Sequence, residues 1–198
     1  DNDFTASLLT YPKIPEDQFS LLSYVSGIAF YESLIKLGVS NKKLSLKWPN
    51  DLLLNGKKIG GILLERITTL QNGEKPLVVG FGLNLVSFPS VSKLDKDALP
   101  ATSLKSDGLV LSKPEEVLNV LMETFKKWHD IFLKHGFPAI IEAFLERTIP
   151  IGRRIKIKTI NKVSYGSFSG ITNNGSLRLN TVAGIVFITA GDVFLVGN

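Results

Sequence analysis

A cation, an amide and a carboxylate stand close together in residues 47–51, whose sequence is KWPND. Nine residues further on, Gly60 and Gly61 open an apolar run that ends at Glu65. An ammonium group, amide donors and bare glycine backbone in one place suit a bound ligand that is anionic or planar. The residue types therefore indicate a small-molecule site rather than a purely structural turn.

Lys47 is the first candidate for chemistry. Pro49 has no N–H to give to a sheet ladder, so a strand that reaches Lys47 must end there. Lys47 then lies near the open end of a sheet, where an ammonium can neutralise a phosphate or a developing oxyanion. The alternative is an exposed strand lysine, which is the usual place of this residue type.

Asn50 and Asp51 allow two interpretations. Asn and Asp that follow a proline commonly cap a turn by bonding their own backbone. In the functional interpretation, Asp51 orients Lys47 or helps to hold Mg²⁺, and Asn50 reaches a nucleotide. Both interpretations can hold at once.

Two neighbouring strands carry glycines where side chains are expected. Gly60 and Gly61 lie in one strand, and Gly80 and Gly82 lie in the next. Glycine costs stability inside a strand and is tolerated where a ligand or another backbone comes close, or at a β-bulge. Two adjacent bare strands predict a slot for a flat apolar ligand. The pattern is not a dinucleotide fingerprint, because the third glycine and the following helix are missing.

Composition narrows the function classes. The chain has 198 residues, 44% of them hydrophobic and 21% charged, which is typical of a globular protein. It has no cysteine, which excludes disulfides and thiolate metal sites, and His129 and His135 have no clustered third ligand, so no metal site is predicted. No apolar run approaches the roughly 20 residues that span a bilayer, so no membrane partner and a cytosolic location are expected.

The formal charge of +5 comes from scattered lysines. A solvated basic face is the favoured interpretation, and attraction to anionic nucleotides or to an acidic protein partner is the next. No nucleic-acid-binding motif occurs, so no nucleic acid is predicted as a partner.

The periodicities predict an α+β fold in two parts, residues 1–149 and 150–198. In the first part we expect helices from Phe19 to Leu37, from a capping box at Ser112 to Gly136, and from Pro138 onward. Strands are expected at 4–11, 44–47, 51–54, 58–67 and 77–85, with an Asn55-Gly56 turn and a loop over 86–111. In the second part five short strands are expected at 154–160, 163–171, 176–179, 185–189 and 193–196, which favours a small SH3-like β-barrel.

Taken together, these motifs resemble those of biotin protein ligases. The resemblance runs along almost the whole chain and rests on KWPND at 47–51, KIGGIL at 58–63, GFGLN at 80–84, ATSL at 101–104, Gly152-Arg153 and Gly191-Asp192-Val193. It implies a mixed β-sheet flanked by helices, related to class II aminoacyl-tRNA synthetases, with a C-terminal SH3-like barrel. It also implies an ATP-dependent, AMP-forming ligase that makes biotinyl-5′-AMP with MgATP and passes biotin to a lysine of a biotin carboxyl carrier protein.

The resemblance also implies roles for single residues. Lys47 and Asp51 are the implied catalytic residues, and Lys47 contacts the carboxyl end of biotin and the α-phosphate. The biotin ring system is expected against Gly60, Gly61, Ile62, Gly80 and Gly82. Nucleotide contacts are expected from Asn50, Lys58, Asn84 and Arg153. No general base for the acceptor lysine is assigned.

One family feature is missing from these 198 residues. Biotin protein ligases carry a loop rich in glycine and arginine before the strand that matches residues 4–11, and it folds over the adenylate. Its absence motivates one alternative, a non-catalytic remnant that binds the carrier protein. The other alternative is a lipoyl or octanoyl ligase or transferase on the related fold. Pairing of edge strands into a homodimer is a further expectation.

Overall fold

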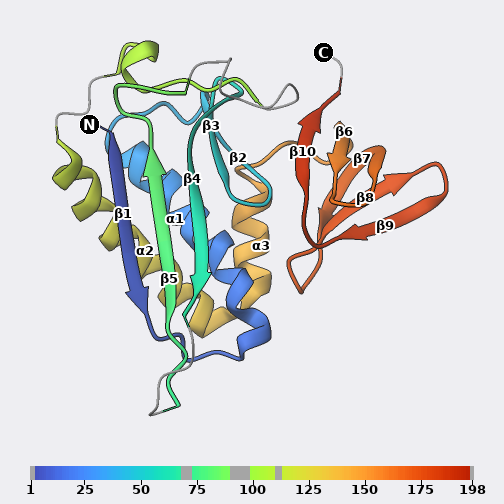
Figure 1. Ribbon diagram of the computed structural model, residues 1–198, viewed down its shortest axis with the longest axis horizontal. Helices are drawn as coiled ribbons and strands as arrows, with labels where there is room; N and C mark the ends of the chain where they lie inside the picture. Colours follow the sequence, from blue (N-terminus) through green and yellow to red (C-terminus); the bar gives the residue numbers. More distant parts are fainter. Residues whose placement is uncertain (1–2, 68–72, 90–98, 110–112, 197–198) are drawn as a thin grey trace.

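The computed structural model describes residues 3–67, 73–89, 99–109 and 113–196, which form two five-stranded sheets and the helices beside them (Figure 1). The first sheet contains β1 (Phe4–Thr10), β2 (Leu44–Lys47), β3 (Asp51–Leu54), β4 (Lys57–Arg66) and β5 (Leu77–Leu83). The second contains β6 (Arg154–Lys158), β7 (Val163–Ile171), β8 (Leu177–Thr181), β9 (Gly184–Ile188) and β10 (Asp192–Leu195). The strands expected from the sequence are thus present, with ends that differ by a few residues.

The first sheet is antiparallel, so the expectation of a mixed sheet is wrong for the described strands. Its strand order is β1-β5-β4-β3-β2, and every ladder between neighbours is antiparallel. The reason is connectivity: β2, β3, β4 and β5 follow one another as neighbours, which reverses direction at each step, and β1 joins the far edge beside β5. Among the described residues, parallel pairing is limited to isolated bridges, Leu46 with Thr148 and Lys58 with Ala101.

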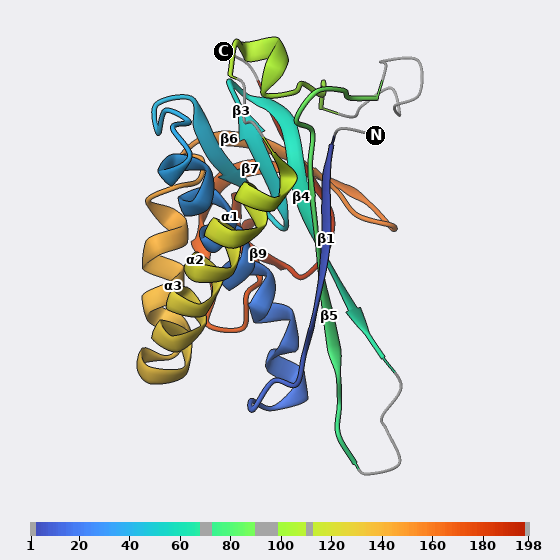
Figure 2. The same ribbon diagram turned by 90° about the vertical axis from the view of Figure 1, so that its left-hand side faces the viewer.

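Three α-helices in the described residues lie against one face of this sheet (Figure 2). They are α1 (Leu22–Lys36), preceded by the 3-10 turn η1 (Glu16–Leu21), α2 (Pro114–His135) and α3 (Phe137–Leu145). Phe81 of β5 points into this layer, where its ring meets Phe30 of α1 at 5.5 Å and Phe125 of α2 at 6.3 Å between centroids. The core therefore sits between these helices and one face of the sheet, and none of the described α-helices covers the opposite face.

Glycines end two of these helices as expected. Gly38 follows α1 with φ of 95°, and Gly136 follows α2 with φ of 72°. Both values lie in the region that suits glycine. Helix α2 begins at Pro114 with Lys113 as its N-cap. The predicted capping residue, Ser112, lies outside the described residues. The loop expected over 86–111 contains a 3-10 turn, η3 (Lys105–Asp107), in its described part.

The predicted Asn55-Gly56 turn joins β3 to β4. Asn55 has φ of 49° and Gly56 has φ of 74°, and two positive φ values in succession are what a type I′ turn requires. The turn sets which residues of β3 and β4 face each other. Asp51 consequently pairs with Gly61 and Leu52 with Gly60, with a register irregularity between Leu52 and Leu53.

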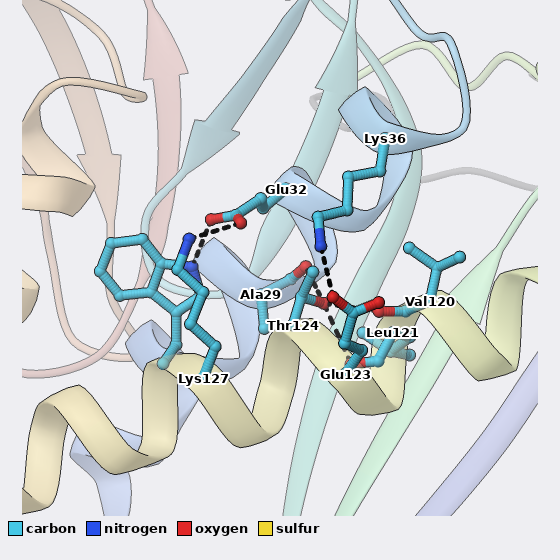
Figure 3. A network of polar contacts seen from close by, with 9 residues as sticks. Ala29, Glu32, Lys36, Val120, Leu121, Glu123, Thr124 and Lys127 are labelled. Atoms are coloured by element: carbon cyan, nitrogen blue, oxygen red, sulfur yellow. Dashed lines mark hydrogen bonds and ion pairs between the residues drawn. The ribbon is translucent and has the colours of Figure 1, made fainter.

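Polar contacts join α1 to α2 along the surface of the helical layer (Figure 3). Thr124 donates a hydrogen bond to the carbonyl oxygen of Ala29 at 2.9 Å, and Lys36 pairs with Glu123 at 2.8 Å. Glu32 of α1 accepts hydrogen bonds from Lys127 at 2.6 Å and from the Trp128 indole at 2.7 Å.

These two bonds decide the charge of Glu32. Burial alone would raise the pKa of Glu32, but the hydrogen bonds lower it below its ordinary value, so the carboxylate stays charged.

The second sheet lies beside the first, with β10 on the side that faces it (Figure 1). Its strand order is β10-β6-β7-β8-β9, and all of its ladders are antiparallel. Ile155, Ile157 and Val193 point to the buried side of the sheet. Among the helices that the structure describes, none is long and apolar enough to cross a membrane.

Candidate functional site

Asp51 is the centre of the charged cluster that the sequence indicates. Its two carboxylate oxygens pair with Lys47 at 2.8 Å and with Lys58 at 2.5 Å. The side chains of Lys47 and Asp51 are only 6% and 10% exposed, whereas that of Lys58 is 46% exposed. Two ammonium groups on one carboxylate leave one unit of positive charge. Because Lys58 is the more exposed partner, it can leave Asp51 for an anionic ligand at lower cost than Lys47.

The fold explains why the buried Lys47 lies beside Asp51. Strand β2 ends at Lys47, and β3 begins at Asp51, directly opposite it in the β2–β3 ladder. The peptide bond between Trp48 and Pro49 is cis. The turn at 48–50 thus brings Lys47 and Asp51 together without any other element. This confirms the expectation that the strand ends at the proline.

Hydrogen bonds connect the same turn to helix α1 and, through it, to the second sheet. Trp48 is buried, and its indole nitrogen donates a hydrogen bond to the Tyr24 hydroxyl at 2.7 Å. That hydroxyl donates to the carbonyl oxygen of Gly175, in the turn between β7 and β8, at 2.6 Å. Burial raises the pKa of Tyr24 well above its usual value, outweighing the opposing hydrogen bond from Trp48, so the hydroxyl keeps its proton and remains a donor.

A cavity of about 740 Å³ lies over the helix-free face of the first sheet, next to Asp51. Its walls come from all five strands of the first sheet, from the loop around Ala101, and from β6 and β10 of the second sheet. Among the lining residues are Thr5, Ser7, Lys47, Asn50, Asp51, Lys58, Gly60, Gly61, Ile62, Leu63, Gly80, Gly82, Asn84, Lys158, Asp192 and Phe194. Such a volume is typical of sites for small-molecule ligands and cofactors.

The glycines of β4 and β5 play two different parts. A Cβ on Gly82 would meet no atom within 4 Å, and one on Gly61 would meet its nearest neighbour at 3.4 Å, so both positions open toward the cavity. A Cβ on Gly60 would lie 2.5 Å from the carbonyl oxygen of Gly82, so that glycine is required by the close approach of two strands. Gly80 lies opposite Leu63, whose side chain is 57% exposed on the cavity face.

Ile62 lies on the helix face, although it is among the cavity-lining residues. Its Cδ1 is 3.9 Å from the position that a Cβ on Gly27 of α1 would take, and its side chain is 3% exposed. Strand alternation places the Ile62 side chain opposite to Gly61. Only the backbone of Ile62 can therefore reach a ligand in the cavity.

The two candidate asparagines both bond to the backbone. Asn50 donates from its side chain to the carbonyl oxygen of Ile62 in β4 at 2.7 Å, and not to its own turn as the turn-capping interpretation expects. Asn84 donates to the carbonyl oxygen of Thr102 at 2.9 Å. Both residues line the cavity. Each bond leaves the amide oxygen as an acceptor toward a ligand.

Arg153 is the candidate that the structure does not bring to the cavity. It precedes β6, and among the described residues that line the cavity the second sheet contributes Lys158, Asp192, Val193 and Phe194 instead. Sequence reasoning gave no role to Lys158 or Phe194. The Gly191-Asp192-Val193 motif was the one available signal for this wall.

The donor set does not form a complete metal cage. No group of three or more His, Asp or Glu side chains that could hold a metal ion occurs within residues 3–67, 73–89, 99–109 and 113–196. Asp51, the buried carboxylate at the cavity, is already paired with two lysines. Mg²⁺ that arrives with nucleotide phosphates commonly uses only one or two protein carboxylates and needs no such cage.

A second cavity of about 610 Å³ adjoins the first and shares Asn50, Ile62 and Leu63 with it. It lies between the start of α1, the end of the first sheet and the turn at 174–176 of the second sheet. Arg66 lies at this cavity, with its guanidinium 5.5 Å from the Phe19 ring centroid. The Trp48 turn therefore separates two hollows, and the charged cluster faces the larger one.

Two family models match the chain, one on each sheet. The biotin/lipoate A/B protein ligase family matches residues 1–146, and the biotin protein ligase C-terminal domain matches residues 151–196. A biotin–[acetyl-CoA-carboxylase] ligase of Paracoccus denitrificans is 34% identical over 98% of this chain and 81% of its own length. A bifunctional ligase/repressor BirA of Bacillus subtilis is 26% identical over 98% of this chain, which spans 58% of that protein.

Solved structures agree with the fold. The crystal structure of biotin protein ligase from Aquifex aeolicus superposes with a TM-score of 0.79 at 22% identity, covering 99% of this chain and 83% of that one. The same Aquifex protein in complex with biotin and ATP gives 0.77 at 23% identity, covering 100% of this chain and 80% of that one. At this identity the likeness establishes a shared fold of both sheets.

Proposed function

Because the chain belongs to the biotin protein ligase family, we propose that it is a biotin–[acetyl-CoA-carboxylase] ligase that uses ATP. The observation that supports this most directly is the cavity itself. At Gly61 and Gly82 no side chain fills the cavity beside the Lys47–Asp51–Lys58 cluster. A flat apolar ring system and an anionic tail can therefore be accommodated side by side.

The proposed reaction has two steps. A carboxylate oxygen of biotin attacks the α-phosphorus of ATP, the bond to the bridging oxygen of pyrophosphate breaks, and biotinyl-5′-AMP forms. The amine of an acceptor lysine then attacks the acyl carbon, AMP leaves, and the nitrogen loses a proton. The acceptor is the biotin carboxyl carrier protein. Both steps concentrate negative charge on phosphate oxygens, which a nearby cation stabilises.

The charged cluster is proposed to meet the reacting groups. Lys58 contacts the biotin carboxylate and the α-phosphate, because its ammonium is exposed to the cavity. Lys47, which the sequence favoured for this contact, acts with Asp51 as the buried support that sets the position of Lys58. Once Lys58 has turned to the ligand, the freed oxygen of Asp51 would hold Mg²⁺ that enters with ATP, and the ion would neutralise phosphate charge.

The ring system and the nucleotide are proposed to divide the cavity. Biotin lies over Gly61, Gly80 and Gly82, with Gly60 holding the two strands together and the backbone of Ile62 beside them. Asn50 and Asn84 offer amide oxygens to the nucleotide. Lys158 takes the place that the sequence suggested for Arg153.

The wider organisation is part of the same proposal. We infer a catalytic unit over residues 1–149, related to class II aminoacyl-tRNA synthetases, and a C-terminal SH3-like unit over 150–198. A cytoplasmic location, where ATP is available, is part of this proposal. A homodimer through strand edges stays a prediction.

The test is turnover by the 198-residue chain with biotin and MgATP. We expect pyrophosphate release that depends on biotin, followed by a biotin label on a carrier domain of acetyl-CoA carboxylase. Replacing biotin with lipoate or octanoate addresses the lipoyl alternative, since the family matching residues 1–146 includes lipoate ligases. Carrier binding without pyrophosphate release would instead identify the chain as a non-catalytic carrier-binding protein.

A further inference from the structure

The net charge of the chain is confined to its second sheet. Six of the 23 Lys and Arg residues, but only one of the 18 Asp and Glu residues, fall within 151–196. This segment therefore carries a formal charge of +5, which equals that of the whole chain, and the remainder is neutral. The charged residues concerned are Arg153, Arg154, Lys156, Lys158, Lys162, Arg178 and Asp192. A concentrated positive field of this kind attracts acidic surfaces.

Part of this charge is interleaved with apolar side chains on one face of three adjacent strands. Tyr165 of β7 lies opposite Lys156 of β6, which lies opposite Phe194 of β10. Directly paired residues of neighbouring strands project from the same face. With their neighbours at the same face they form a set that we call the outer patch, consisting of Arg154, Lys156, Lys158, Val163, Tyr165, Phe194 and one acidic residue, Asp192.

The outer patch is open to solvent even though it contains large apolar groups. Tyr165 is 60% exposed and Val163 is 50% exposed. The Lys156 ammonium lies 4.6 Å from the centroid of the Phe194 ring. The opposite face of the same strands holds the buried side chains of this unit, so the outer patch is not needed for its core. Adjoining exposed apolar groups with cations around them are typical of protein docking surfaces.

The outer patch is continuous with the larger cavity. Lys158 and Phe194 belong to both, because β6 and β10 form the cavity wall on the side of the second sheet. Asp192, the single acidic residue of the segment, lies opposite Lys158 at this border. A macromolecule seated on the outer patch therefore stands at the mouth of the cavity, where it can extend one side chain toward Asp51 and Lys58.

We propose that the outer patch is the docking surface for the acceptor protein, which binds through acidic side chains near the lysine that it presents. The inference rests on the proposed ligase function, since that reaction requires a second protein to deliver an amine to the cavity. Acidic groups on the acceptor complement Arg154 and Lys156, and an apolar contact with Tyr165 excludes water. Binding of nucleic acid to the same cations is the competing outcome of the test.

The test compares two charge reversals that change the net charge equally. Arg154→Glu alters the outer patch, whereas Lys126→Glu alters an exposed site on α2, where the side chain is 79% exposed. With a purified carrier domain of acetyl-CoA carboxylase at low salt, we expect Arg154→Glu to raise the KM for the carrier about tenfold. Biotin-dependent pyrophosphate release without carrier should stay at the parent rate in both variants. Added NaCl should weaken carrier use by the parent more than by Arg154→Glu.

An apolar pair of variants tests the other half of the outer patch. Tyr165→Ser removes an exposed ring from the patch, and Ile185→Ser removes a comparably exposed side chain, 53%, from β9 in the same sheet. We expect only Tyr165→Ser to raise the KM for the carrier. Equal KM values for Arg154→Glu and Lys126→Glu, or for the two serine variants, would overturn the proposal.

Failure of the ligase function is distinguishable from failure of this inference. If the parent releases no pyrophosphate, direct binding of the carrier domain to the parent and to Arg154→Glu decides the question by calorimetry. Loss of binding in Arg154→Glu supports the docking surface whatever the activity. No carrier binding by the parent, or binding of single-stranded DNA in its place, refutes it.

Discussion

The indole N–H of Trp48 bonds to the hydroxyl of Tyr24 at 2.7 Å, which ties the turn of the charged cluster to helix α1. The same hydroxyl donates a hydrogen bond to the carbonyl oxygen of Gly175, in the turn between β7 and β8 of the second sheet. A second link lies one residue before Lys47, where the backbone of Leu46 bonds to Arg147 at 2.7 Å and to Thr148 at 2.8 Å. Lys47 is thus held between two anchored neighbours.

Removing the hydroxyl in Tyr24→Phe should lower both stability and the rate of adenylate formation. The Trp48 N–H loses its short partner in a buried place, which costs about 1–3 kcal/mol in free energy of unfolding. The rate of pyrophosphate release should fall about tenfold, since small displacements of catalytic groups are costly. Tyr31→Phe on the same helix is the control, because the Tyr31 ring lies under Arg147 and away from the cavity. Similar rates for the two variants would refute a positioning role for Tyr24.

Truncating the two lysines should separate support from catalysis. Lys58→Ala removes the exposed cation and should reduce pyrophosphate release by about 10²–10³ with little change in Tm. Lys47→Ala leaves Asp51 without its buried partner and should lower the free energy of unfolding by about 1–3 kcal/mol as well as the rate. Thermal melts and pyrophosphate assays on the two variants, with Lys36→Ala as an exposed control, measure both effects. A Lys58→Ala enzyme within threefold of the parent would exclude the role given to Lys58.

The glycines of the slot should respond in opposite ways. Gly82→Val places a side chain in open cavity space, so the fold should persist while biotin affinity falls at least about tenfold, or ~1.4 kcal/mol. Gly60→Ala forces a Cβ to within 2.5 Å of a carbonyl oxygen and should lower Tm. Calorimetric titration with biotin and thermal unfolding distinguish the two outcomes. Unchanged biotin affinity in a folded Gly82→Val protein contradicts the slot.

His129 should make the protein less stable in mild acid. Burial lowers its pKa below the ordinary value of 6.5, with Asp130 opposing, and its ring stacks on Phe125 at 5.8 Å. The unfolded chain therefore takes up a proton more readily than the folded one, and stability is lost as pH falls through 6.5 toward the folded pKa. His129→Phe should show a smaller fall of Tm between pH 7.5 and 5.5. Parallel pH curves for parent and variant would disprove this contribution.

Local signals predicted the elements well because their causes are local. The Asn55-Gly56 turn, the helix ends at Gly38 and Gly136, and the strand end before Pro49 each follow from the backbone preferences of one or two residues. Strand pairing was predicted less well. The sheet was expected to be mixed, and the long-range choice that places β1 beside β5 leaves no mark in any short window of sequence.

In the candidate site, too, features with local causes could be predicted and features that depend on long-range packing could not. Gly61, Gly82 and Asp51 could be predicted to line the cavity because glycine is unusual inside a strand and Asp51 closely follows Pro49. The contrast between sealed Lys47 and exposed Lys58 could not be read from sequence, since both are strand lysines and burial depends on packing. The link from Trp48 through Tyr24 to Gly175 joins residues more than 120 positions apart, and no pattern announces it.

A single pairing register of strand β5 supplies both the core and the ligand cavity. Its odd-numbered residues Val79, Phe81 and Leu83 are buried, while Gly80 and Gly82 alternate with them on the cavity side. A shift of one residue in its pairing would exchange the two sets, placing aromatic and aliphatic bulk in the ligand space and gaps in the interior. Protein stability and ligand recognition therefore depend on the same register of this strand, so that an insertion or deletion there damages both.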